Sequence, residues 1–151
     1  MPIVKKKSDL FPDRAAEEPA ADPARARGRP IVAAFTATNA ADDSLGSTYL
    51  LAELPSDCIL DALTFFKVDD TGFAAIRIGT LADAEALVAV QKSAGATVTP
   101  ITRGGADHGK PLWEVLGLAS DPGGFIGIYQ HAIANATGAG TILGEIHYRY
   151  R

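Results

Sequence analysis

Three histidines are the residues of this chain best suited to hold a metal ion or to move protons, and they lie at positions His108, His131 and His147. His131 and His147 fall in two consecutive predicted strands that would pair as a hairpin, so their side chains could lie near each other. A zinc site needs three or four ligands, and no cysteine or third histidine falls in register with this pair. We therefore expect ordinary surface or half-buried histidines and no metal site.

A catalytic group could also lie in the glycine-rich stretch around Asp107 and His108, because loops often carry active-site residues. The chain has neither a Gly-x-Ser-x-Gly motif that would supply a nucleophile nor a Walker motif. The glycines at 138 and 140 precede a predicted strand rather than a helix, which does not fit a dinucleotide-binding loop. The acidic pairs at 42–43 and 69–70 fall in predicted turns, where aspartate bonds nearby backbone. A glycosidase-type carboxylate pair stays open without any pattern to indicate it, and we expect no enzymatic activity and no cofactor.

Bulk composition narrows the class of protein further. Cys58 is the single cysteine, which excludes an internal disulfide and fits a protein made in a reducing cytoplasm. We interpret Cys58 as a small apolar residue at the start of a strand. No run of 18 apolar residues exists, and no apolar stretch follows Lys5–Lys7 to make a secretory signal, so we expect no membrane partner. The mild net charge of −4 argues against a general nucleic-acid binder.

The elements that would position these residues are short strands, and three of them follow one another between Ser47 and Thr80. Their ranges are 47–54, 58–68 and 73–80, and Pro, Asp and Gly residues separate them, which is typical of a β-meander. In the third strand Ile76 and Ile78 alternate with Arg77, which indicates a sheet with one wet face. Phe65 and Phe66 are adjacent, so one of them must leave the core face. An exposed Phe there would be a contact candidate, and cover by loops is the favoured alternative.

The remaining segments complete an all-β pattern. Strands are predicted over 31–38, 112–118, 125–133 and 141–150, and a weak strand over 96–102 carries a proline typical of a sheet edge. The last two strands are predicted to form a hairpin. The stretch 80–95 is the one helix candidate, because Thr80 and Asp83 have the spacing of a capping box, and we predict a short helix or a structured loop that crosses the sheet edge there. We predict a β-sandwich, jelly-roll-like or Greek-key, over residues 31–151 with at most one short helix.

Residues 1–30 differ from the rest of the chain and form a second predicted region. They hold five of the nine prolines and one aromatic residue, with seven basic against five acidic side chains, whereas the remainder has seven basic against 13 acidic. Such a segment has too little apolar surface to offset the entropy of ordering it. We predict an extended N-terminal arm that a domain, a sister copy or another protein holds in place. A passive linker is the alternative.

The order of turns and strands from Ser47 onward resembles small structural proteins of tailed bacteriophages. These are encoded among the head genes and are named decoration, cement or minor head proteins. The resemblance covers roughly residues 30–151, and the segments that carry it are YLLAELPSDCILDALTFF, FAAIRIGT, PLWEVLGL, DPGGFIGIYQ and GTILGEIHYRY. It implies a virion protein on the capsid exterior that binds the major capsid protein and stabilises the shell. It also implies a homo-oligomer, a trimer before a dimer, without catalytic residues.

The arm is predicted to grip another subunit by lying extended over its surface. Its basic side chains would pair with acidic groups of a shell protein, and its few apolar side chains would anchor it. The residues predicted to make this contact are Ile3, Val4, Lys5, Lys6, Lys7, Phe11, Arg14, Arg25, Arg27 and Arg29. Contact with nucleic acid is the disfavoured alternative, because five acidic residues are interspersed.

Two other functions stay open. One is a tail or head–tail joining protein, which would also be rich in β-structure. The other is a cellular β-sandwich that binds a carbohydrate or another ligand. A module of that kind should show clustered exposed aromatics or a metal site, and this chain has one tryptophan and scattered tyrosines.

Overall fold

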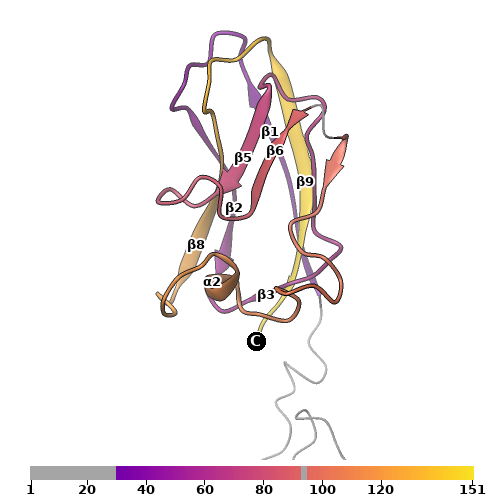
Figure 1. The fold of residues 1–151 in the computed structure, drawn as a ribbon, viewed down its shortest axis with the longest axis vertical. Helices are drawn as coiled ribbons and strands as arrows, with labels where there is room; N and C mark the ends of the chain where they lie inside the picture. Colours follow the sequence, from indigo (N-terminus) through magenta and orange to yellow (C-terminus); the bar gives the residue numbers. More distant parts are fainter. Residues whose placement is uncertain (1–29, 93–94) are drawn as a thin grey trace, which may run out of the picture.

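The computed structural model describes residues 30–92 and 95–151, and within them the chain folds into two antiparallel β-sheets packed face to face (Figure 1). One short helix, α2, lies near the end of the sandwich where the C-terminus is found (Figure 1). The predicted all-β sandwich with at most one short helix is confirmed. Among the described residues, no helix is long and apolar enough to cross a membrane.

Each sheet is built from strands that are distant in sequence. The first, called the β9 sheet here, contains in spatial order β1 (Ile31–Asn39), β9 (Gly140–Arg149), β4 (Phe65–Lys67) and β7 (Thr97–Val98), and β3 (Ile59–Leu60) also pairs with β9. The second, called the β8 sheet, contains β2 (Thr48–Pro55), β8 (Phe125–His131), β5 (Ala75–Gly79) and β6 (Val88–Gln91).

The strand pairs are nested along the chain. β1 pairs with β9, β2 with β8, β4 with β7 and β5 with β6, all antiparallel. The predicted meander over 47–80 and the predicted hairpin of the last two strands are therefore wrong, because consecutive strands there belong to opposite sheets. The turns between them carry the chain across the sandwich, which lets the apolar face of every strand meet one shared core.

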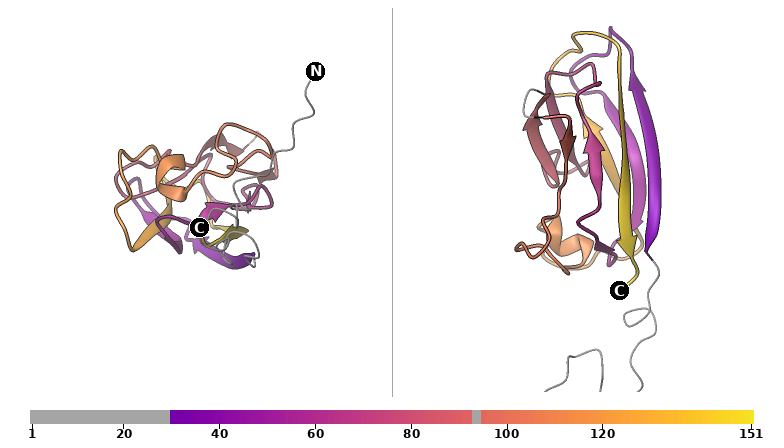
Figure 2. Two further views of the ribbon diagram at one scale, coloured as in Figure 1. Left: turned by 90° about the horizontal axis from the view of Figure 1, so that it is seen from below. Right: turned by 90° about the vertical axis from the view of Figure 1, so that its right-hand side faces the viewer.

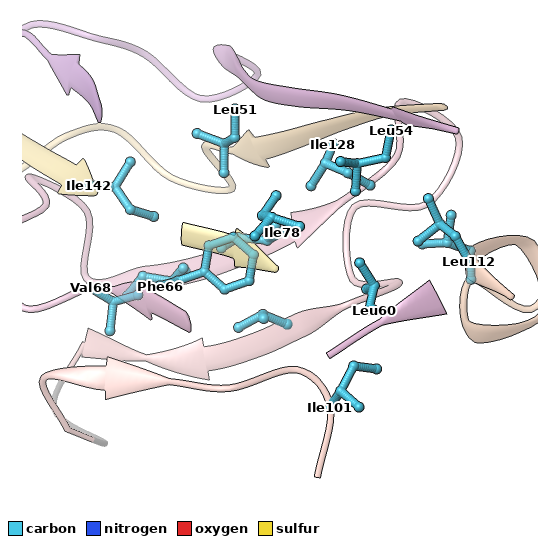
Figure 3. Packing of buried hydrophobic residues seen from close by; sticks show 14 of the residues in the cluster. Leu51, Leu54, Leu60, Phe66, Val68, Ile78, Ile101, Leu112, Ile128 and Ile142 are labelled. Atoms are coloured by element: carbon cyan, nitrogen blue, oxygen red, sulfur yellow. The ribbon is translucent and has the colours of Figure 1, made fainter. Parts of the chain in front are cut away.

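The core is the layer between the two sheets (Figure 3). Ile76, Ile78 and Ile128 of the β8 sheet and Phe66 and Ile142 of the β9 sheet are each at most 1% exposed. The period-2 pattern of the sequence places these residues correctly, because alternate side chains of a strand point to the same face. Burial of each such side chain contributes about 1.5–3 kcal/mol to the free energy of unfolding.

The β9 sheet depends on a glycine in its central strand. Gly144 lies opposite Phe35 of β1 and Phe66 of β4. A Cβ atom on Gly144 would lie 2.2 Å from the backbone oxygen of Phe65 and 2.8 Å from the ring of Phe35. The close approach lets the rings of Phe35 and Phe66 pack with their centroids 5.7 Å apart.

The predicted strand over 112–118 is instead the helix α2 (Leu112–Val115) and the residues after it. Pro111 precedes the helix with extended backbone angles. The amide of Leu112 donates to the carbonyl of Cys58 at 2.7 Å, and the amide of Trp113 donates to Ser56 at 3.0 Å. One helical turn puts Leu112 and Leu116 on the same buried side, so a short apolar run serves as a plug at the end of the core.

The predicted helix over 80–95 is wrong. Asp83 donates its amide to the hydroxyl of Thr80 at 3.0 Å, and Thr80 donates its amide to the carbonyl of Asp83 at 2.8 Å, which makes a tight turn. The chain then returns as β6, in which Val88 pairs with Ile78. Sheet pairing and a buried Val88 outweigh the helix preference of the alanines here. Of the weak strand predicted over 96–102, only Thr97–Val98 is a strand.

The predicted strand over 58–68 is divided into β3 and β4. A turn separates them, in which the amide of Thr64 donates to the carbonyl of Asp61 at 3.0 Å. Phe66 is fully buried and Phe65 is partly buried, so neither is an exposed contact residue. This agrees with the favoured alternative, in which both phenylalanines are covered.

Candidate interaction surfaces

The histidines do not form a site. His131 lies in the β8 sheet and His147 in the β9 sheet, so no hairpin brings the two together. The Nε2 atom of His131 lies 2.8 Å from the carbonyl oxygen of Thr80, and Nε2 of His147 lies 2.8 Å from a carboxylate oxygen of Glu145. Over residues 30–92 and 95–151, no group of three or more potential ligands could hold a metal ion.

Cys58 has the environment of a core residue. Its side chain is fully buried among the hydrophobic residues of the sandwich. Burial, with a smaller effect from Asp57, raises the pKa of its thiol to about 12. Because the thiolate is the reactive form, this thiol is inert at neutral pH, as its interpretation as a small apolar residue implied.

One titratable pair fastens the loop after β1 to the β8 sheet. The hydroxyl of Tyr49 donates a hydrogen bond to Asp43 at 2.5 Å. Burial and this bond raise the pKa of Tyr49 to about 12, and the same bond lowers the pKa of Asp43. Both groups are satisfied by each other and by local backbone, so the pair stabilises the loop and offers no reactive group.

Neither cavity described for the chain suits a small organic ligand. The pocket beside Pro30, lined also by Asp61, Tyr148 and Arg149, holds about 170 Å³, whereas ligand pockets usually hold about 300–1,000 Å³. A wider hollow of about 470 Å³, lined by Asp69, Ala74, Gln91, Lys92 and Thr137, is shallow and open to solvent. Ligand pockets are usually clefts that bury most of the ligand surface, so these cavities do not support the alternative of a ligand-binding module.

An apolar surface lies on the outer face of the β8 sheet. Leu50 of β2 is 50% exposed and pairs with the half-buried Tyr129 of β8, while Phe125 at the start of β8 is 69% exposed. A Cβ atom on Gly127 would lie 2.6 Å from the ring of Tyr129, so the ring lies over this glycine. We call the surface formed by Leu50, Phe125 and Tyr129 the β8 patch, and the exposed Glu53, which pairs with Gly127, lies within it. Exposed large apolar groups of this kind are typical of contact surfaces.

The sequence pattern could have revealed part of the β8 patch. Phe125, Gly127 and Tyr129 alternate, so they share one face, and Ile126 and Ile128 share the other. Leu50 is harder to assign. A bulge between Leu50 and Ala52 interrupts the alternation of β2 and turns the neighbouring Leu51 into the core.

The ten predicted arm residues, from Ile3 to Arg29, lie outside the described residues. The arm contact therefore stays a prediction. The described part from Pro30 onward carries seven basic and 13 acidic side chains, opposite in net sign to the arm.

Comparison with known proteins finds a similar fold and identifies no family. No protein-family model and no curated protein matches this sequence. A chain in the solved structure of the cyanophage Pam1 capsid asymmetric unit is similar, with a TM-score of 0.55 and 12% sequence identity. The match covers 82% of this chain and 86% of that chain, so the two folds agree over nearly their whole length. At this identity the likeness is one of fold.

Proposed function

We propose that this protein is a virion structural protein of a tailed phage, a decoration or cement protein that binds the outside of the head shell and stabilises it. The observation that carries this proposal is the match of the sandwich, over most of both chains, to a chain of a phage capsid asymmetric unit. The resemblance of the segments between Ser47 and Arg151 to head decoration proteins supports the same function independently of the fold comparison.

The proposal includes the way in which the protein acts. A jelly-roll-like sandwich with inert polar groups acts by contact and has no enzymatic activity. The major capsid protein is the partner, and the protein occupies the shell as a homo-oligomer, with a trimer favoured over a dimer. Many weak contacts in many copies give a stable coat, because linked contacts multiply in strength.

Two surfaces would make the contacts with the shell. The first is the arm, whose thirty residues could span up to about 100 Å when extended. The second is the β8 patch, whose apolar side chains would be covered by a subunit of the shell. An arm that reaches one subunit while the sandwich rests on another would hold the two together.

The experiment is cosedimentation with icosahedral shells. Particles that lack this protein are mixed with the full chain, with a chain lacking residues 1–29, and with a Leu50→Ser/Phe125→Ser variant. The full chain should sediment with shells at a fixed copy number, and both variants should bind with lower occupancy or release at lower salt. A Leu81→Ser/Ile133→Ser variant is the control, because it removes exposed apolar side chains outside the patch. Absence of the full chain from shells would contradict the proposal, and unchanged binding without residues 1–29 would make the arm a passive linker.

The tail or head–tail joining alternative predicts a different location. Electron microscopy of particles that carry a gold-labelled chain separates the two readings. Label spread over the head supports a decoration protein, and label confined to one vertex or to the tail supports the alternative.

A further inference from the structure

β1 has a long free edge. It pairs with β9 over all nine residues from Ile31 to Asn39, and in the described part of the chain no strand pairs with its other edge. β1 lies along one margin of the sandwich (Figure 2, right). An unpaired edge of this length presents a row of backbone donors and acceptors to another strand.

The free edge of β1 lacks the features that usually prevent pairing. The strand IVAAFTATN has no charged residue, no proline and no bulge. The other edge strands differ. β2 carries a bulge, Glu53 and a terminal proline, whereas β6 and β7 have four and two residues. Natural sheets protect exposed edges by charge, proline, bulges or shortness, so β1 is the one described edge left open to a partner.

The sequence of β1 suits pairing with a second copy of itself. In an antiparallel pair centred on Phe35, Ile31 lies opposite Asn39 of the second copy and Ala34 lies opposite Thr36. This alignment keeps the core-facing residues of both strands on one face and the exposed ones on the other. The exposed residues Val32, Ala34, Thr36 and Thr38 are small and uncharged, so none of them repels its counterpart.

The geometry of the edge selects the antiparallel direction. One edge of β1 is paired with β9, so a second copy can meet only the other edge. Two copies can bring this same edge together, with their core faces on one side, only when one copy is turned end for end. Such a pair of strands is antiparallel.

We propose that β1 is a self-association edge, at which two copies pair antiparallel about Phe35 and join their β9 sheets into one continuous sheet. The contact has two-fold symmetry. It therefore also links two trimers where the protein forms trimers. One pair of strands buries less than the roughly 1,200 Å² of a stable interface, so the contact is weak in solution and is favoured where copies are crowded.

The experiment is sedimentation velocity of the full chain over a wide concentration range. Charge variants at positions 34 and 36 test whether these residues lie opposite each other in the paired copies. In an Ala34→Lys/Thr36→Lys variant, two lysines of each copy face two of the other. The fraction of paired species should fall as for a roughly tenfold weaker contact, because like charges directly opposite destabilise strand pairing. In an Ala34→Lys/Thr36→Glu variant each lysine faces a glutamate, and pairing should return with added sensitivity to salt. Gln91→Lys on β6, at an exposed position opposite the uncharged Ala75, is the control and should leave pairing unchanged.

Cysteine cross-linking tests the same register without depending on affinity. A mixture of Ala34→Cys and Thr36→Cys chains should give a mixed disulfide dimer faster than either chain alone, while the native Cys58 is buried and takes no part. The proposal is overturned if the full chain stays unpaired and gives no mixed disulfide, or if the double-lysine and lysine–glutamate variants associate equally. The readouts need no shell, so they separate this proposal from the proposed function.

Discussion

Single polar residues hold the turns of this sandwich together, and Asn39 at the end of β1 is the most connected of them. Its side chain is 4% exposed. The amide nitrogen donates to the carbonyls of Ala40 and Gly138, and the amide oxygen accepts from the backbone nitrogen of Gly72, all at 2.9 Å. One side chain thus joins the end of β1 to the turns that precede β5 and β9.

Asn39→Ala should lower the free energy of unfolding by about 2–4 kcal/mol, because it leaves buried backbone groups on Gly72 and Gly138 without partners. Asn135→Ala is the matched control. It removes one bond, from the amide of Leu45, at an exposed site, and should change stability by about 1 kcal/mol or less. Urea denaturation of both variants measures the difference. If both variants lose the same free energy of unfolding, the buried hydrogen bonds of Asn39 contribute no more than the exposed bond of Asn135.

Tyr49 should make stability depend on alkaline pH. The folded state raises its pKa from 10.0 to about 12, so the folded chain holds the phenol proton more tightly than the unfolded chain. The stabilisation is present in full below pH 10 and is lost as the pH rises from 10 to about 12. Urea midpoints of the wild type should therefore fall between pH 9 and pH 11 by more than those of Tyr49→Phe. The control is Tyr150→Phe, at a residue that is 50% exposed. Its urea midpoint should fall by as much as that of the wild type.

At the scale of elements, β9 pairs with β1, β3 and β4, and its Gly144 has no space for a side chain. Gly144→Ala should destabilise the protein by about 1–3 kcal/mol or more, because its Cβ would meet the backbone of Phe65 as well as the ring of Phe35. Gly138→Ala serves as the control, since a Cβ there meets no atom within 4 Å. Thermal unfolding followed by circular dichroism compares the two variants. A Gly144→Ala protein as stable as the control would mean that β9 shifts freely between its neighbours.

Strand positions could be predicted from the sequence, and strand partners could not. Alternation identifies the inward residues of β5 and β9, such as Ile78 and Ile146, because burial acts on each strand locally. Pairing is set by the whole chain. The turn at 121–124 and the turn before β9 look like hairpin turns, yet β8 pairs with β2 and β5 and β9 pairs with β1 and β4, all of which are distant in sequence.

Short apolar runs were the other source of error. The run LWEVLGL fits a strand or a turn of helix equally well on its own. The backbone of Ser56 and Cys58 decides between them by accepting the amides of Trp113 and Leu112. At 80–95 the opposite error occurs, since a helix is predicted and the structure has a strand. The alanines favour a helix, but β5 offers Val88 and Val90 a strand partner.

At the scale of the whole molecule, the described core is built from residues of the strands, of α2 and of the turns between them. The buried hydrophobic residues of the described part run from Leu51 to Ile146. Deletion of residues 1–29 should therefore leave the free energy of unfolding within about 0.5 kcal/mol of the full chain, as substitutions outside packed regions usually do. Urea denaturation with an unchanged slope checks this. A large loss of stability would mean that the arm packs on its own domain and is not available to a neighbour.

The surfaces that would meet a partner were predicted less well than the core. The FxGxY pattern around Gly127 was visible in the sequence, but Leu50 is exposed because of a bulge that no local rule indicates. The free edge of β1 depends on which strands lie beside it, and this follows from the topology of the finished sheet. Partners recognise surfaces made by distant segments, whereas sequence periodicity reports each segment alone.

The nested pairing of the strands also sets the order in which the strand pairs can form while the chain is synthesised on the ribosome. The inner pair, β5 with β6, can close as soon as Gln91 has emerged, but β1 waits for β9, whose last residue is Arg149. Closure of such long loops makes folding slow, because chain entropy is lost before the contacts form. Until β9 has emerged, both edges of β1 are unpaired, and unpaired strand edges favour aggregation, so we expect chaperones to assist the folding of this sandwich.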